Sequence, residues 1–300
     1  MGPGAHEAAA AHADPPATVI LTTLSLRLLK PLFGLLFAAL ALNAGAAALD
    51  IPTPYIPSTR SNVDEMLRLA DVKPSDVVFD LGSGDGRIVI AAAKEWGARG
   101  VGIEIDPELV KLSAANAAQA GVADRAVFRQ GDVLKADLRE ATVVTIYLLT
   151  SLVERLQPRL YAELRPGTRV IAHDYPFAGW QPDRKVNISK TYYLYVVPAR
   201  VAGRWAVEVD LPGGRRTYDL GLEQHYQEVK GGARVAGGYL PAFDARLNGE
   251  RIAFVLIDEE QSYRFEGTVR DGAMQGEVRY GYGPRQSTAR WQARLAVSGK

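Results

Sequence analysis

The chain has 300 residues, of which 47% are hydrophobic and 23% charged, and its formal net charge is +1. This composition fits a globular protein of one or two domains, and a charge so close to zero gives no electrostatic support for a nucleic-acid partner. The chain has no cysteine and only four histidines, which are not paired at ligand spacing, so disulfides and a cysteine nucleophile are excluded and we expect no metal centre.

The N-terminal part of the chain has the composition of a leader. Residues 1–16 are rich in Gly, Ala, His and Pro, which predicts disorder. Basic residues then precede an apolar run at 31–42, which has signal-peptide length and is followed by small residues that match a leader-peptidase site. Extended to Leu49, the run is just long enough to span a bilayer, while a buried core helix is the plainer alternative. We therefore expect a signal peptide or membrane anchor within residues 1–49 and a membrane-associated or exported protein, with the side of the membrane open.

The segment that follows the leader has two interpretations. Residues 50–60 are punctuated by proline and should be extended. Ser61 or Asn62 can cap a helix predicted over 63–69. Tyr55 and the hydroxyls after it precede the first strand, so the segment is either an ordinary linker or a lid over a bound cofactor.

Residues 77–106 carry the strongest signal in the chain. An apolar strand ends at Asp80, a helix is expected over 87–96, and a second strand over 101–105. Glu104, about 20 residues beyond the turn, is placed to accept hydrogen bonds from ribose hydroxyls. A turn of small residues lets a ligand approach the backbone and the amides of the helix N-terminus. The turn consists of Gly82, Ser83, Gly84, Asp85 and Gly86.

The glycine spacing distinguishes between nucleoside cofactors. A dinucleotide fingerprint has a glycine at its sixth position, where this chain has Arg87. Asp80 would repel a pyrophosphate, but it would attract an ammonium group and a sulfonium. The D-x-G-x-G-x-G pattern therefore resembles motif I of the class I S-adenosylmethionine-dependent methyltransferases, and S-adenosylmethionine is the expected cofactor.

Helices and strands continue to alternate up to about residue 198. The fold class predicted for residues 50–199 is α/β, a Rossmann-like doubly wound sheet of about seven strands. In such a sheet Asp132, after the third strand, should face the ligand as Glu104 does, and it can accept from an adenine amino group. Further helices are expected over 107–120 and 152–164, strands over 126–128, 142–149 and 170–172, and a closing hairpin over 185–197.

The chain from Tyr55 to about residue 197 resembles the mitochondrial-type protein-lysine methyltransferases that act on ATP synthase c-subunit and adenine nucleotide translocase, with their bacterial relatives. The resemblance is carried by Tyr55-Ile-Pro-Ser58, residues 80–89, Glu104 and Trp180-Gln-Pro182. It implies an enzyme that methylates a lysine side chain of a protein, and membrane association through the N-terminal apolar segment. A small amine as acceptor, or a non-catalytic S-adenosylmethionine-binding envelope protein, are the alternatives.

The candidate acceptor residues follow the fourth and fifth strands. Many methyltransferases of amide or nucleobase nitrogen have Asn or Asp and Pro-Pro-aromatic after the fourth strand, where this chain has Tyr147-Leu-Leu-Thr150. An exocyclic-amine or glutamine substrate therefore loses support, and a primary amine remains possible. A lysine amine has a pKa of about 10.4, so its pocket must disfavour the ammonium or let the proton escape. We expect Asp174 to orient the amine, Tyr147 and Tyr55 to form an aromatic wall, and His173 to line the pocket. A solvated strand-end turn is the alternative for His173 and Asp174.

The last hundred residues change character. Alternating patterns at 218–226 and 252–256, with hairpin turns at Asn248-Gly249 and Asp271-Gly272, are typical of antiparallel strands. We predict a small antiparallel β domain, a barrel or a sandwich, over residues 200–300. No catalytic group stands out in it.

Overall fold

The computed structural model describes residues 56–296 except 260, 282, 284 and 285. The described residues belong to one compact unit. The predicted leader and Tyr55 lie outside the described residues. None of the helices in the described part of the chain has both the length and the hydropathy needed to cross a bilayer.

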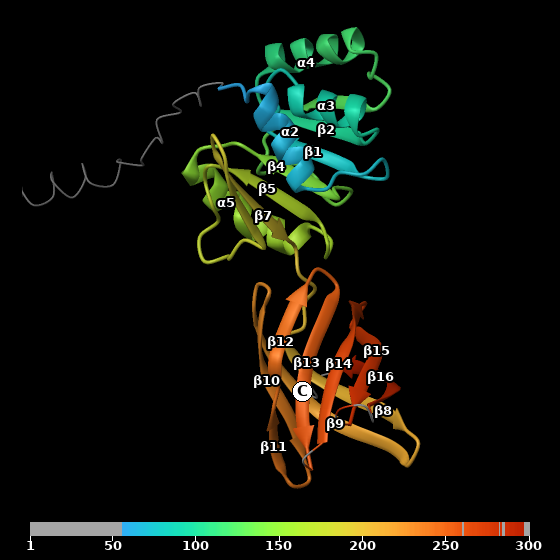
Figure 1. The fold of residues 1–300 in the computed structure, drawn as a ribbon. Helices are drawn as coiled ribbons and strands as arrows, with labels where there is room; N and C mark the ends of the chain where they lie inside the picture. The colour runs from blue at the N-terminus through green and yellow to red at the C-terminus, as the bar shows by residue number, and fades with distance from the viewer. Residues whose placement is uncertain (1–55, 260, 282, 284–285, 297–300) are drawn as a thin grey trace, which may run out of the picture. The chain divides into compact units, whose positions relative to one another are not determined.

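A seven-stranded mixed sheet forms the first domain of the described chain, as predicted (Figure 1). Its order is β3-β2-β1-β4-β5-β7-β6, and β7 runs in the opposite direction to the other six strands. The strands are β1 (Val77–Leu81), β2 (Arg99–Glu104), β3 (Ala126–Gln130), β4 (Val143–Ile146), β5 (Arg169–His173), β6 (Arg184–Asn187) and β7 (Thr191–Val196). Because β4 ends at Ile146, earlier than the predicted 149, Tyr147 lies in the loop beyond the strand.

Four helices of the described chain flank this sheet: α2 (Arg60–Leu69), α3 (Arg87–Glu95), α4 (Pro107–Gln119) and α5 (Thr150–Glu163). The prediction that Ser61 or Asn62 caps α2 is wrong. Thr59 has the extended backbone that an N-cap needs, and its hydroxyl accepts from the Asn62 N–H at 3.3 Å. The helix therefore begins at Arg60.

Both faces of the sheet are covered, which explains why β1 is buried along its whole length. Val78 belongs to the apolar cluster that contains Met66 of α2 and Ile88 of α3. Phe79 belongs to the opposite cluster, with Leu156 of α5. Since side chains alternate along a strand, Asp80 lies on the same face as Val78, which is the face of α3.

The strand order reverses next to β1. The chain proceeds outward from β1 to β3 and then returns to place β4 on the other side of β1. In doubly wound sheets ligands bind at the carboxyl ends of the strands at such a switch point. The residues that follow β1, β2, β4 and β5 are therefore brought to one edge.

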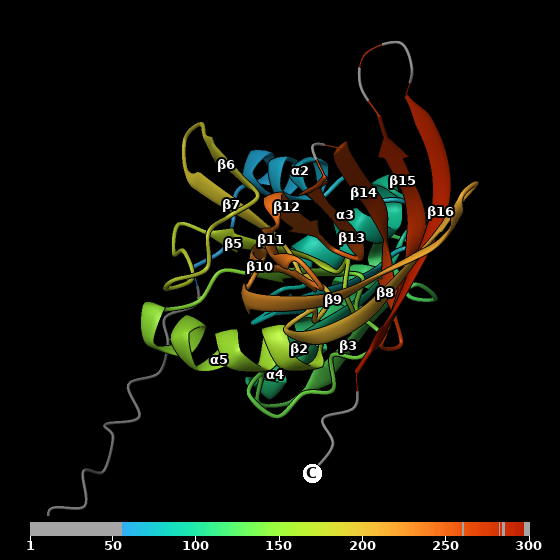
Figure 2. The same ribbon diagram turned by 90° about the horizontal axis from the view of Figure 1, so that it is seen from below.

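A closed antiparallel barrel forms the second domain, which decides between the predicted barrel and sandwich. Strands β8 and β16 pair at one seam, and β9 and β10 pair at another, so every strand of the ring has two neighbours (Figures 1 and 2). The ring contains β8 (Gly203–Leu211), β9 (Gly214–His225), β10 (Glu228–Val235), β12 (Phe243–Asn248), β13 (Arg251–Asp258), β14 (Gln261–Arg270), β15 (Ala273–Tyr280) and β16 (Ser287–Leu295), and β11 (Gly238–Pro241) pairs with β10.

Aromatic side chains fill the barrel. Phe254 stacks on Phe265 at 4.6 Å between ring centroids, and Trp291 meets Phe265 edge-on at 5.3 Å. Phe265 and Trp291 lie between exposed neighbours, as an alternating pattern predicts, whereas Phe254 is followed by the buried Val255. The turn at Asp271-Gly272 joins β14 to β15.

Two residues from the different domains stack face to face. The Tyr226 ring lies 4.8 Å from that of Trp180 with an interplanar angle of 4°, and its hydroxyl accepts from Gln157 Nε2 at 2.7 Å. Trp180, one of the residues that carry the family resemblance, is only 1% exposed. We infer that the role of Trp180 is structural, through its packing against Tyr226.

Candidate functional site

The turn after β1 needs glycine for two different reasons. Gly82, Gly84 and Gly86 have φ values of +82°, +54° and +83°, a region that other residues rarely adopt. In addition, a Cβ on Gly86 would lie 2.5 Å from the Phe128 ring. The amides of Gly82 and Ser83 both donate to the Ile103 carbonyl, at 2.9 and 3.1 Å, which fastens the turn to β2.

Glu104, at the end of β2, binds the backbone of the same turn. Its Oε2 accepts from the Gly84 N–H at 2.9 Å, and its Oε1 accepts from the N–H groups of Ile105 and Asp106 at 2.8 and 3.1 Å. These bonds fix the carboxylate at the carboxyl end of β2, although it is only 8% exposed. One lone-pair site remains, on Oε2, for a ribose hydroxyl.

Asp80 is a buried carboxyl group at the end of β1. Its Oδ1 accepts from the Thr145 hydroxyl at 2.7 Å, a contact that sequence reasoning missed because a threonine in a buried strand gives no distinctive signal. Burial, together with the nearby Glu104 and Asp85 charges, raises the pKa of Asp80 to about 7 despite the Thr145 bond. A cationic ligand group here would favour the ionised carboxylate.

Arg87, at the position where a dinucleotide fingerprint has glycine, links the turn to the segment before α2. Its Nη1 donates to the Ser58 carbonyl at 2.5 Å, while Nη2 and Nε donate to the Asp85 carboxylate at 2.6 and 2.9 Å. Asn116 Nδ2 donates to the Asp85 carbonyl at 2.9 Å. Arg87 therefore connects the Ser58 backbone to Asp85 of the glycine turn, while the Thr59 hydroxyl is used in the helix cap. The interpretation of this segment as a lid stays a prediction.

These residues fit the cofactor that the sequence predicts. At Gly82 the turn presents backbone atoms and no side chain. A side chain would not fit there, because its Cβ would lie 2.8 Å from Leu148. The Ser83 hydroxyl is buried without a protein partner. Glu104 would hold the ribose, and Asp80 would face the ammonium and sulfonium charges. S-adenosylmethionine supplies an electrophilic methyl group when bound.

One oxygen of the Asp132 carboxylate already accepts a hydrogen bond from the backbone. Asp132 follows β3, and its Oδ1 accepts from the Leu134 N–H at 2.9 Å, which makes it a turn-capping residue. Its Oδ2 lies 3.9 Å from Lys135 Nζ. Its role toward an adenine amino group stays a prediction.

The candidate acceptor residues gather beyond β4 and β5. Tyr147 stacks on His173 at 4.0 Å, and Tyr192 lies on the other side of His173 at 5.0 Å. Asp174 follows His173 with φ +62°, a strained backbone for a non-glycine residue, and its Oδ2 accepts from Lys190 Nζ at 2.8 Å. The structure thus brings Tyr147 and Asp174 together, and it adds Tyr192 and Lys190, which sequence reasoning missed.

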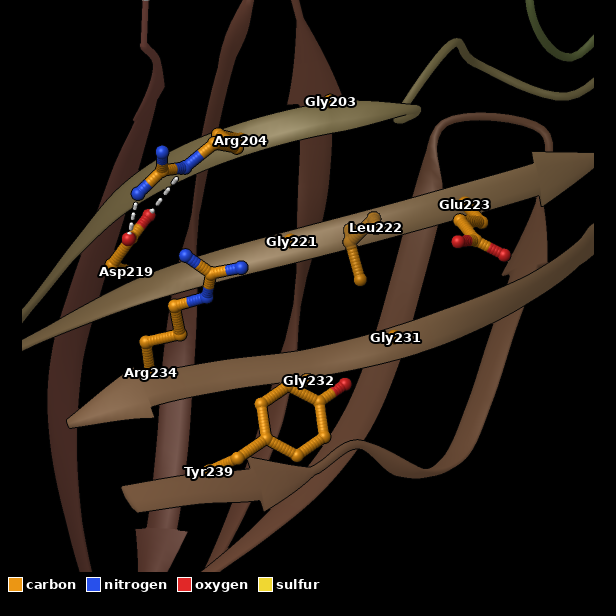
Figure 3. A pocket seen from close by; sticks show the side chains of 10 residues that line it. All are labelled: Gly203, Arg204, Asp219, Gly221, Leu222, Glu223, Gly231, Gly232, Arg234 and Tyr239. Carbon is orange, nitrogen blue, oxygen red and sulfur yellow. Dashed lines mark hydrogen bonds and ion pairs between the residues drawn. The ribbon is translucent and has the colours of Figure 1, made fainter. Parts of the chain in front are cut away.

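A second concave region lies on the outer surface of the barrel. Gly221, Gly231 and Gly232 leave a hollow of about 360 Å³ beside the exposed Tyr239 ring (Figure 3). Arg204 and Asp219 form an ion pair at its rim. None of its lining residues is a nucleophile beside a general base, so the hollow offers no catalytic arrangement.

The chain matches a known methyltransferase family. The model of the ANTKMT methyltransferase domain matches residues 80–184. A protein-lysine N-methyltransferase of Saccharolobus islandicus is 43% identical over 150 residues, which are 48% of this chain and 93% of that protein. The chain belongs to this methyltransferase family. It is therefore an S-adenosylmethionine-dependent methyltransferase, and the matched region includes the glycine turn and Glu104.

Other relatives cover less of their own length or carry a different description. The lysine N-methyltransferase of the ATP synthase c-subunit from Mus musculus is 41% identical over 130 residues, 43% of this chain and 52% of that protein, so the chain spans about half of this relative. A solved structure described as an RNA methyltransferase from Salinibacter ruber with S-adenosyl-L-homocysteine is 54% identical, with a TM-score of 0.48, and covers 49% of this chain and 96% of its own.

We expect the methyltransferase to bind its cofactor more tightly as the pH rises through about 7. Below this value Asp80 is protonated, because its pKa is raised to about 7, and only the ionised form attracts the cationic cofactor. The Kd for S-adenosylmethionine should fall about tenfold between pH 6 and pH 8, as expected for one coupled proton. Calorimetric titrations measure this. Asp80→Asn should flatten the profile, and an unchanged slope in that variant would assign the titration to another group.

Proposed function

We propose that this methyltransferase transfers a methyl group to the side-chain amine of lysine in a protein substrate. The observation that carries the proposal is the position of a primary ammonium, that of Lys190, at 2.8 Å from Asp174 Oδ2 beyond β5. The site therefore accommodates the chemical group that a lysine acceptor would present. The names of the relatives from Saccharolobus islandicus and Mus musculus support the same acceptor class.

The residues beyond β4 and β5 suit this acceptor. The Asp174 carboxylate can hold and orient an incoming ammonium, and Tyr147 offers an aromatic face beside it. The amine must lose its proton to water before its lone pair can attack the methyl carbon. Positioning of the two reacting atoms is then most of what the protein supplies. Tyr55, the remaining predicted wall residue, lies outside the described part of the chain.

Incubation of the purified protein with methyl-labelled S-adenosylmethionine and a cell extract tests the proposal. We expect label in protein, recovered as methylated lysine after acid hydrolysis. Label in RNA would contradict the proposal, as would label confined to small amines. Cofactor binding without transfer to any extract component would instead indicate a non-catalytic binding protein. A parallel incubation without the protein provides the blank for incorporation that does not depend on the enzyme.

We further propose, from the sequence alone, that the apolar segment at residues 31–49 attaches the protein to a membrane. The support is the length of the apolar run and the basic residues that precede it. Fractionation of the native protein with carbonate washing should leave it in the membrane pellet, and protease protection would identify the side that the methyltransferase domain faces. Recovery in the wash supernatant would contradict the attachment.

A further inference from the structure

The β6–β7 turn brings a lysine onto Asp174. The Ile188 N–H donates to the Lys190 carbonyl at 3.0 Å, which closes the turn. Lys190 Nζ then donates to Asp174 Oδ2 at 2.8 Å, and the Thr191 N–H donates to Oδ1 at 3.1 Å. The Asp174 N–H donates in return to the Thr191 carbonyl at 2.7 Å. The direction of the carboxylate is thus fixed by β7, whether or not an amine is bound to it.

An aromatic stack lies beside this ion pair. The Nε2 of the buried His173 lies 3.8 Å from Asp174 Oδ2, and the Tyr147 ring stacks on His173 at 4.0 Å between centroids. The Asp174 bond is the main reason why the pKa of Lys190 is raised. Burial lowers the pKa of His173, so this imidazole stays neutral and does not repel a cation.

The Lys190 side chain is held weakly enough to move. It remains 43% exposed, and the turn that carries it is open to solvent, with Ile188 66% exposed. Ion pairs at this degree of exposure stabilise a protein only slightly, because water and salt screen them. An incoming ammonium can therefore replace Lys190 on Asp174. The Asp174 carboxylate stays in place when Lys190 leaves, because the Thr191 N–H still donates to it.

We propose that Lys190 occupies the ammonium subsite on Asp174, beside the stacked rings of His173 and Tyr147, when no acceptor is bound, and that an acceptor lysine must displace it. The inference rests on the proposed lysine acceptor and deepens it. Lys190 is thus an internal competitor that sets how tightly an acceptor ammonium binds. For an ion pair of this exposure, the competition should weaken acceptor binding by about two- to sixfold.

The test uses n-butylammonium, which has the chemistry of a lysine side chain, as the probe. It is titrated by NMR into the full-length protein saturated with S-adenosylhomocysteine. The Kd for n-butylammonium should fall about two- to sixfold in Lys190→Met relative to the unaltered protein. Lys190→Gln should give the same shift, and Asp174→Asn combined with Lys190→Met should abolish binding.

Lys185→Met is the matched control. Lys185 lies on the same hairpin, but its Nζ is 5.4 Å from the Tyr193 ring centroid, and we expect no change in Kd from its replacement. Equal Kd values in the unaltered protein and Lys190→Met would overturn the proposal, as would binding that survives the loss of Asp174. Absence of n-butylammonium binding in all variants would also overturn it.

The thermal midpoint and the Kd for S-adenosylhomocysteine are measured for each variant, because these two quantities should not change with Lys190. This experiment does not depend on catalysis. Failure to label protein in the extract assay would refute the proposed lysine acceptor. The n-butylammonium titration would still test separately whether Lys190 competes for Asp174.

Discussion

Replacing Glu104 with glutamine is expected to weaken S-adenosylmethionine binding by about a hundredfold, or about 2.7 kcal/mol. The carboxylate accepts from the N–H groups of Gly84, Ile105 and Asp106. A glutamine has only one acceptor oxygen, so its amide nitrogen would face at least one of these donors. The variant also loses the negative charge that receives the ribose hydroxyls. Isothermal titration with S-adenosylmethionine measures the change.

Glu108→Gln makes the same chemical change at a position without this network. Glu108 lies in the first turn of α4, where its side chain is 75% exposed and pairs with Lys111. We expect its Kd for S-adenosylmethionine to stay within about twofold of the unaltered value, since exposed pairs contribute little. Equal losses in the two variants would point to the general charge of the protein, and no loss in Glu104→Gln would remove this residue from the cofactor site.

Gly86→Ala is expected to lower the free energy of unfolding by about 2–5 kcal/mol and to impair cofactor binding. One part of the cost is the φ of +83°, which an L-residue adopts only with strain. The other part is steric, because the new Cβ would lie 2.5 Å from the Phe128 ring and 2.8 Å from Ser113 Cβ. Denaturant titration followed by circular dichroism measures the stability, and calorimetry measures the Kd.

Gly121→Ala separates these two contributions. Gly121 has a similar φ of +72°, but no atom lies within 4 Å of the position where its Cβ would be. We expect a loss of only about 1–2 kcal/mol from backbone strain, with cofactor affinity unchanged. If the two alanine variants were equally destabilised, the close approach of Phe128 to the turn would have no energetic consequence.

The barrel extends the chain beyond the region that the family match covers. The match ends at residue 184, and the first barrel strand begins at Gly203. Tyr226, in the turn between β9 and β10, packs on Trp180 and bonds to Gln157 of α5, so the barrel contributes a side chain to the packing of the methyltransferase domain. Removal of the barrel would expose Trp180, and the test variants above are therefore made in the full chain.

The sequence by itself determined the glycine turn, the acidic residue at the end of β2 and the seven-stranded sheet. These features are local, because a backbone at positive φ requires glycine at Gly82, Gly84 and Gly86, and strands covered on both faces require continuous apolar residues. The pattern D-x-G-x-G-x-G also placed Asp80 correctly at the end of its strand. The same reasoning reached the antiparallel character of the last hundred residues, since alternation has a period of two.

Only the tertiary structure decided which partners these residues have. Thr145 donates to Asp80, 65 residues earlier in the chain, and Lys190 donates to Asp174, 16 residues earlier. No local pattern specifies such pairs. The choice between a barrel and a sandwich likewise depended on the pairing of β8 with β16 and of β9 with β10. Alternation sets which face of a strand is buried but does not set which edges meet, because edge pairing depends on the positions of strands far apart in the chain.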